Sequence, residues 1–151
     1  MSLFRISALA AVAAALFCSQ LSFAEITDLR VDEPSRLPTV VFAFNCPVTT
    51  DQLSQVVESA LEKRGIRSEV WRGQTFGYTA AAVCREHESG QHLFVLQFRF
   101  GTELEGDVKV AFVEQGYQVN AGIGGEAELL EEFAASLDMS LYDYVRQNIW
   151  D

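Results

Sequence analysis

The 151-residue sequence has few basic side chains for its length. Lysine and arginine number 11 against 21 acidic residues, which gives a formal net charge of -10. Nucleic-acid-binding proteins normally carry a basic face, and anionic lipid attracts basic segments, so we expect neither kind of partner. Internal repeats, low-complexity segments and long linkers are also absent. With 49% apolar and 21% charged residues, the composition predicts one folded domain and excludes a wholly disordered chain.

The sequence also lacks an apolar run that is long enough to span a membrane. Residues 6–17 form an apolar run of about a dozen residues, whereas a transmembrane helix needs about 20. Arg5 precedes this run, and the small residues Ser22 and Ala24 follow it. This three-part pattern predicts a secretory signal peptide over residues 1–24, cleaved after Ala24. We therefore expect a periplasmic or secreted protein with no membrane-inserted segment after cleavage.

Cysteine is scarce, with three in the chain and no CxxC motif. Cys18 lies inside the predicted signal peptide and follows the bulky Phe17, whereas a lipid-modified cysteine normally follows a small residue. Cys46 and Cys84 then remain, and an even number of cysteines in an oxidising compartment predicts a disulfide bond. The alternatives are a reactive thiol pair or a metal-binding pair, but no lysine or arginine flanks Cys46 to activate its thiol.

The first half of the predicted mature chain contains its best-marked helix. Residues 25–38 are polar and predict an extended lead-in, and the β-branched and aromatic residues 39–45 predict a buried strand. Thr49 and Gln52 have the spacing of a capping box, which starts a helix, and Gly65 follows two cations as a typical helix stop. The apolar stripe of this helix is predicted to be Leu53, Val56, Val57, Ala60 and Leu61.

Alternating apolar residues predict a β-hairpin in the middle of the chain. Residues 76–84 and 94–100 alternate on either side of a turn that ends at Gly90. A two-residue loop and a three-residue loop are both compatible with this turn. We favour the three-residue loop, with Gly90 in the left-handed conformation, because it pairs Cys84 with Phe94 and puts both apolar sets on one face.

A second hairpin and one or two helices are predicted for the rest of the chain. Residues 108–121 alternate, with the turn at 115–116, and residues 126–137 repeat apolar side chains at helical spacing. Ser140 is a candidate cap for a separate last helix. Strands and helices are grouped, so the sequence predicts one α+β domain over residues 39–151. We expect a mostly antiparallel sheet of four to six strands, packed by one helix from the N-terminal half and one or two C-terminal helices.

The sequence carries no recognisable catalytic motif. GxSxG is absent, and the glycine-rich run at 122–125 lacks the lysine of a phosphate-binding loop. His87 and His92 are the only histidines, and the favoured register points them to opposite faces of the hairpin, so we expect no metal site. We therefore expect neither enzymatic activity nor a cofactor. The alternatives are an envelope protein that binds a ligand or metal, and a hydrolase with a carboxylate pair.

Acidic residues gather in the last third of the chain. Residues 101–151 contain 11 acids but only Lys109 and Arg146 as cations. This asymmetry predicts a surface that attracts a basic protein, and a solvated surface that merely aids solubility is the alternative. The candidate acidic contacts are Glu103, Glu105, Asp107, Glu126, Glu128, Glu131 and Glu132, and the candidate aromatic anchors are Tyr142, Tyr144 and Trp150.

Export, small size, a disulfide and an acidic C-terminal half together favour a binding protein. Enzymes that act on the anionic cell wall are often basic, so an acidic partner is electrostatically suited to them. Our hypothesis is an inhibitor or immunity-type protein that occludes a basic partner such as a cell-wall-degrading enzyme. Its oligomeric state is open at this point.

Overall fold

The computed structural model describes residues 29–71, 76–105 and 110–150, with side chains described outside residues 103–117. Its elements in chain order are β1 (Arg36–Phe44), α2 (Thr50–Glu62), β2 (Arg67–Val70), β3 (Phe76–Glu86), β4 (His92–Glu105), β5 (Val110–Gly124) and α3 (Glu126–Asn148). Within these residues the strands form one sheet in the order β2-β1-β3-β4-β5. The short pairs of β1 with β2 and β3 are parallel, and the long pairs of β4 with β3 and β5 are antiparallel. The predicted α+β class with a mostly antiparallel sheet is confirmed.

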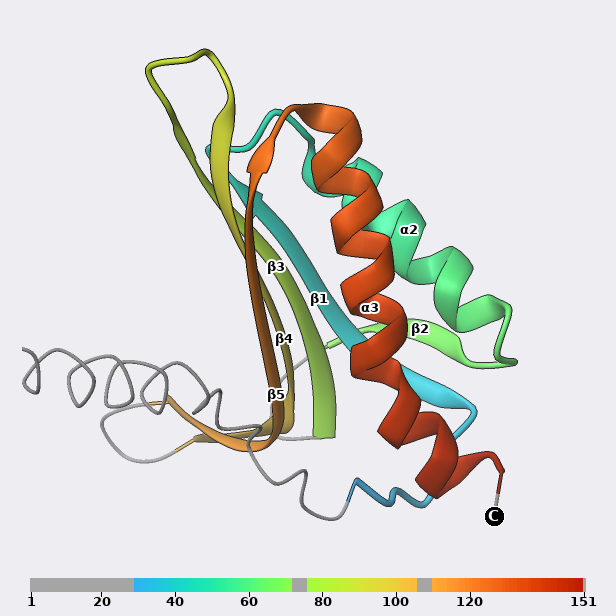
Figure 1. Ribbon diagram of the computed structural model, residues 1–151. Helices are drawn as coiled ribbons and strands as arrows, with labels where there is room; N and C mark the ends of the chain where they lie inside the picture. The colour runs from blue at the N-terminus through green and yellow to red at the C-terminus, as the bar shows by residue number, and fades with distance from the viewer. Residues whose placement is uncertain (1–28, 72–75, 106–109, 151) are drawn as a thin grey trace, which may run out of the picture.

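Both helices cover the same face of the sheet and leave the other face without a covering layer in the described part of the chain (Figure 1). Helix α2 packs on β1 and β2, α3 packs on β4 and β5, and the two helices touch each other. Neither helix combines the length and apolar content that a membrane crossing requires. The molecule is therefore a two-layer arrangement, with its core between the helices and one side of the sheet.

The predicted start and end of α2 are confirmed. The Thr49 side chain accepts a hydrogen bond from the Gln52 amide at 3.2 Å, and the Gln52 side chain accepts one from the Thr49 amide at 2.8 Å. This reciprocal pair satisfies two backbone donors that the first turn of a helix otherwise leaves unpaired. After the helix, Gly65 has a φ of 72°, in the left-handed region that glycine adopts without strain. Leu53, Val57, Ala60 and Leu61 of the predicted stripe are buried, and Val56 is partly buried.

The first hairpin has the predicted three-residue register. Cys84 pairs with Phe94 and Glu86 pairs with His92, while the His87 amide donates to the Gln91 carbonyl at 2.7 Å. Gly90 has a φ of 80°, as the three-residue loop requires. The large aromatics of β4 therefore lie on the same face as the small residues of β3, and this face is the one covered by α2 and α3.

The second predicted hairpin, with a turn at Gln115 and Gly116, is wrong. Residues 110–124 form the single strand β5, which pairs with β4 along its length. Phe100 pairs with Gly116 and Gly101 pairs with Glu114, so Gln115 is the extra residue of a β-bulge. A bulge and a turn both interrupt an alternating pattern, and the sequence alone did not separate them. Here β4 is long enough to pair with both predicted arms, which makes an intervening turn unnecessary.

The C-terminal region is one helix rather than two, so the prediction of Ser140 as a cap is wrong. Ser140 lies inside the 23-residue helix α3 and is buried. Its hydroxyl donates to the Leu137 carbonyl at 2.9 Å and accepts from the Tyr78 hydroxyl at 2.5 Å. No glycine or proline interrupts residues 126–148, so nothing in the backbone ends the helix before its last apolar turn.

The core joins distant parts of the chain. Tyr78, Phe98, Phe100 and Tyr144 are buried between β3, β4 and α3, and the rings of Phe100 and Tyr144 stack with centroids 5.5 Å apart. A disulfide joins Cys46, which follows β1, to Cys84 near the end of β3, with Cα atoms 4.8 Å apart, so the predicted pairing is confirmed. Such a bond is typical of proteins outside the cytoplasm. The predicted signal peptide lies outside the described residues.

The described part of the lead-in is held against the C-terminal end of α3. Leu29 is fully buried, and its amide donates to the Gln147 side chain at 2.8 Å. The Val31 amide donates to the Asn148 side chain at 3.0 Å. Strand β1 already begins at Arg36, inside the stretch that was predicted as lead-in, because residues 36–39 pair in parallel with β2.

Candidate functional site

Four predicted acidic residues lie exposed along the first turns of α3. Glu126, Glu128, Glu131 and Glu132 are all on the surface, and none of them takes part in an ion pair among the described residues. Their position at the helix N-terminus is electrostatically favourable because the helix dipole is positive there. Glu128 has an additional structural role, since its carboxylate accepts a hydrogen bond from the Gly125 amide at 3.0 Å.

A small cavity separates this row of carboxylates from strand β5. Its volume is 360 Å³. The carboxylates of α3 form one wall, and apolar residues of β4, β5 and α3 form the rest. The lining residues are Phe94, Ala121, Gly122, Ile123, Glu128, Glu131, Glu132 and Ala135. We call this cavity the acidic notch.

Two glycines of β5 let α3 and the core approach the strand closely at the acidic notch. A Cβ atom on Gly122 would lie 2.5 Å from the ring of Phe94, and one on Gly124 would lie 2.6 Å from Cβ of Glu128. Only glycine fits both positions without displacing these neighbours. The glycine-rich run, which carried no functional prediction, therefore sets the distance between the carboxylates and the edge of the sheet.

The remaining predicted acids do not belong to this surface. Glu103 pairs with Phe112 and Glu105 pairs with Val110, at the end of β4 that lies far from the start of α3. Because His92 pairs with Gly124 next to α3, Glu103 lies roughly 35 Å away along the strand at about 3.3 Å per residue. Asp107 lies outside the described residues. The predicted acids whose backbone the structure describes therefore lie in two separate sets, one at the far end of β4 and one on α3.

The three candidate aromatic anchors also separate. Tyr144 is fully buried, donates a hydrogen bond to the Pro34 carbonyl at 3.1 Å, and is therefore a core residue that is not presented to a partner. Burial raises the pKa of Tyr144 to about 12. Tyr142 and Trp150 are exposed, with their rings in an edge-to-face contact at 5.8 Å. These two remain available for contact at the end of α3.

The two histidines lie at the tip of the first hairpin and do not share a site. The His87 ring bonds to the Ser89 hydroxyl at 2.9 Å, whereas His92 pairs with Glu86 across the hairpin. Among the described residues no group of three or more histidine, cysteine or acidic side chains is arranged to hold a metal ion.

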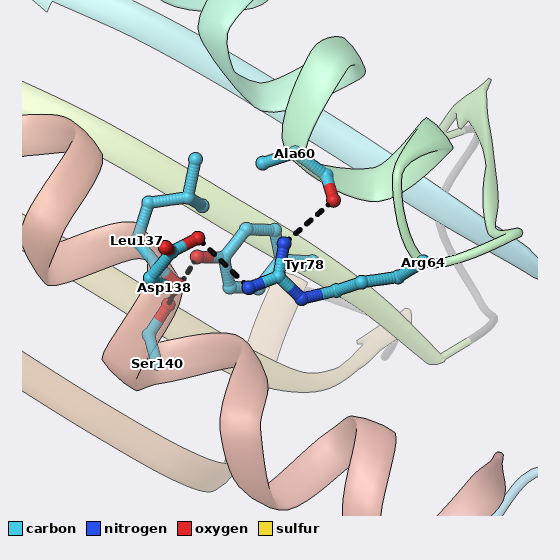
Figure 2. A network of polar contacts seen from close by, with 6 residues as sticks. All are labelled: Ala60, Arg64, Tyr78, Leu137, Asp138 and Ser140. Atoms are coloured by element: carbon cyan, nitrogen blue, oxygen red, sulfur yellow. Dashed lines mark hydrogen bonds and ion pairs between the residues drawn. The ribbon is translucent and has the colours of Figure 1, made fainter.

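A groove of 930 Å³ runs between α2 and α3 on the helical side of the molecule. Arg64 bridges the two helices there, because its guanidinium donates to the Ala60 carbonyl and to the Asp138 carboxylate, each at 2.8 Å (Figure 2). Next to it, burial raises the pKa of the Tyr78 hydroxyl, which is hydrogen-bonded to Ser140. These groups satisfy one another, so they hold the helical layer together and offer no free nucleophile.

The surface that sequence reasoning missed is the uncovered face of the sheet. Strand β1 was predicted to be buried, but its alternate side chains are exposed, with Phe42 at 41% and Phe44 at 60%. Cross-strand pairing of Phe44 with Val83, and of Val83 with Val95, makes this apolar surface continuous across the sheet. Its large apolar members are Val40, Phe42, Phe44, Val83, Leu93, Val95, Val119 and Ile123. Contiguous exposed apolar side chains of this kind are typical of a contact surface.

The sequence contained one signal of this surface. Residues 40–44 are apolar at consecutive positions, so β1 carries apolar side chains on both faces. We interpreted this pattern as burial on both sides, as in a sheet covered by two layers. The described helices cover only one side, and the second apolar set is therefore exposed.

Comparisons with known proteins leave the family open. No protein-family model matches the sequence, and curated proteins give no match. Among solved structures, a PelC dodecamer from Paraburkholderia phytofirmans is similar with a TM-score of 0.42 and 11% identity, over 74% of this chain and 86% of that chain. A minor lipoprotein from Acinetobacter baumannii is similar with a TM-score of 0.33 and 14% identity, over 75% of this chain and 89% of that chain. Both TM-scores are too low for the likeness to indicate a function.

Proposed function

We propose that this protein is a non-catalytic binding protein of the cell envelope that binds and occludes a basic protein, as an inhibitor or immunity protein does. A cell-wall-degrading enzyme is the kind of partner that suits it best. The observation that carries the proposal is the acidic notch, where exposed carboxylates of α3 line a cavity together with apolar residues and make no ion pairs with described cations of the chain.

The acidic notch has the chemistry to receive a lysine or arginine side chain. Glu131 and Glu132 are exposed on α3, and Ala135 of the same helix offers apolar contact to the aliphatic part of such a side chain. The net charge of -10 adds a long-range attraction that raises the rate of encounter with a basic partner. The uncovered sheet face and the exposed Tyr142–Trp150 pair, which lies at the far end of α3, supply apolar area outside this charged contact.

Affinity capture with matched charge variants tests the proposed function. The immobilised protein is exposed to an envelope extract and compared with the variant E131K/E132K and with the control E58K/E62K. The control changes two exposed glutamates on α2, away from the acidic notch, and produces the same change in net charge. Glu128 is left unchanged because it caps Gly125.

We expect the wild-type protein and the control to capture a basic protein that the notch variant loses. The association rate should fall by about tenfold in the notch variant and with added salt, since exposed charges act mainly on encounter. In a turbidity assay on cell walls, the captured protein should be active alone and inhibited by the wild-type chain at a one-to-one ratio. Equal capture by both variants, or a captured protein whose activity is unaffected, would contradict the proposed function.

A further inference from the structure

Strand β5 is an unprotected edge of the sheet. It ends the strand order β2-β1-β3-β4-β5, so within the described residues one side of its backbone has no partner strand (Figure 1). Proteins usually protect such an edge with a short strand, a lysine, a proline or a covering element, because unpaired backbone groups can bind another strand. The opposite edge follows this rule, since β2 has only 4 residues and an ion pair joins Glu69 to Arg36.

The edge strand β5 lacks these protective features next to α3. It has 15 residues, and residues 115–125 contain no charged residue and no proline. The bulge at Gln115 lies at the start of residues 115–125. From Gly116 to Gly124 the strand pairs regularly with β4. Residues 118–124 therefore form a regular edge that can accept an additional strand.

The two flanks of this edge have different chemistry. On the uncovered face of the sheet, Val119 and Ile123 are exposed by 42% and 48%. On the helical face the acidic notch places Glu131 and Glu132 beside the same strand. A strand that paired with β5 would direct its side chains alternately to these two faces, because successive residues of a strand point in opposite directions.

We propose that the β5 edge between residues 118 and 124 binds an extended protein segment in which basic and apolar residues alternate. Backbone hydrogen bonds to β5 hold the segment, its basic side chains enter the acidic notch, and its apolar side chains extend the surface formed by Val119 and Ile123. The inference rests on the proposed function, in that the segment belongs to the basic partner. It adds the binding mode and the residue pattern that the partner must carry.

The charges argue against a second copy of this chain as the occupant. Two copies paired in antiparallel fashion through β5 would form a two-fold symmetric contact, in which each surface meets its own equivalent. The carboxylates of the two acidic notches would then lie on the same side of the joined sheet and repel one another. A basic segment removes this repulsion, so charge complementarity selects it.

A labelled peptide tests the inference directly. The probe is a short fluorescent peptide in which lysine and valine alternate, and the control peptide alternates glutamate and valine. Binding to the intact, disulfide-bonded protein is measured by fluorescence anisotropy, and hydrogen–deuterium exchange locates it. We expect the lysine peptide to slow the exchange of amides in residues 118–124 and to leave α2 unchanged. The glutamate peptide should bind at least about tenfold more weakly.

Protein variants then separate the edge from the rest of the apolar face. V119K/I123K places lysines on the edge strand, and V40K/V83K places them on β1 and β3 at positions of similar exposure on the same face. We expect the first variant to weaken peptide binding by about tenfold, since it removes two apolar cross-strand pairs, and the second to bind as the wild type does. Circular dichroism verifies that both variants are folded.

The results distinguish this inference from the proposed function. The edge inference is overturned if the lysine peptide does not slow amide exchange in β5, or if both peptides bind equally well. It is also overturned if the protein forms a concentration-dependent dimer that V119K/I123K abolishes. If the protein captures and inhibits a basic enzyme but V119K/I123K does so equally well, the function holds and the edge inference fails. If the peptide protects β5 but no basic protein is captured, the edge inference holds and the proposed function fails.

Discussion

The buried hydrogen bond between Tyr78 and Ser140 predicts an unequal response to two deletions. The Tyr78 hydroxyl donates to Ser140 at 2.5 Å, and the Ser140 hydroxyl donates to the Leu137 carbonyl at 2.9 Å. Tyr78 is fully buried and Ser140 is 8% exposed, so water does not replace a lost partner easily. The residue that loses its partner, rather than the bond itself, therefore determines how much stability each change removes.

The expected magnitudes follow from which group is left without a partner. Tyr78→Phe removes one hydrogen bond but leaves Ser140 bonded to Leu137, so the free energy of unfolding should fall by about 1 kcal/mol. Ser140→Ala leaves the Tyr78 hydroxyl buried without its acceptor, which costs about 2 kcal/mol. The better helix propensity of alanine returns about 0.5 kcal/mol of this loss. The double variant contains no unpaired hydroxyl, so it should lose only about 1 kcal/mol, well below the sum of the single changes.

Urea unfolding of the disulfide-bonded protein, followed by circular dichroism, measures all four members of this cycle. Equal m-values show that the changes act on stability alone. The control is Ser59→Ala, at an exposed helical serine of α2, which should change stability by no more than about 0.5 kcal/mol. If Ser140→Ala is no less stable than Tyr78→Phe, or if the two losses add, the argument from the unpaired hydroxyl is refuted.

Three further predictions concern the disulfide, a close contact and the tyrosines. Replacing Cys46 and Cys84 with serine removes a disulfide that joins residues 38 positions apart, so the unfolded chain gains conformational entropy. The free energy of unfolding, measured by urea titration, should fall by about 4 kcal/mol. A loss below about 1 kcal/mol would refute this entropic argument. Gly122→Ala brings a Cβ to 2.5 Å from the Phe94 ring and should lower the free energy of unfolding by about 1–3 kcal/mol. Gly90→Asn, at a left-handed turn with no atom within 4 Å of the new Cβ, should lower it much less. Equal melting temperatures of the two variants would contradict this prediction. Burial raises the pKa of Tyr144 from 10.0 to about 12, so the folded state holds the proton more tightly than the unfolded chain, and the stabilisation is complete below pH 10 and lost as the pH rises toward 12. Melting temperatures measured across this range should fall less steeply for Tyr144→Phe, and an unchanged slope would show that Tyr144 does not cause the loss.

Local features of the fold could be predicted from the sequence because their causes are local. The capping box of Thr49 and Gln52 depends on a spacing of three residues, and the register of the first hairpin depends on Gly90 and on the alternation beside it. The pairing of Cys46 with Cys84 followed from there being two cysteines after the predicted signal peptide. In each case a short stretch, or a count, restricts the chain to one arrangement.

Predictions that depended on distant contacts did less well. An alternating pattern is the same for a turn and for a bulge, and the length of β4 decided between them at Gln115. The helical pattern around Ser140 did not show that its hydroxyl would bond to Tyr78, which is distant in the chain, instead of capping a new helix. Tyr144 could equally have been an exposed anchor or a core residue, and its stacking on Phe100 decided for the core.

The α+β class, the start of α2, the first hairpin and the disulfide follow from patterns that can be read along the chain. Which surfaces are exposed depends instead on how the elements pack. The tertiary structure placed Glu103 roughly 35 Å along the strand from the start of α3 and left Phe42 and Phe44 uncovered. It also placed β5 at the edge of the sheet, beside the carboxylates of α3. Exposure depends on which elements lie next to one another, and strand order is set by packing between segments far apart in the chain.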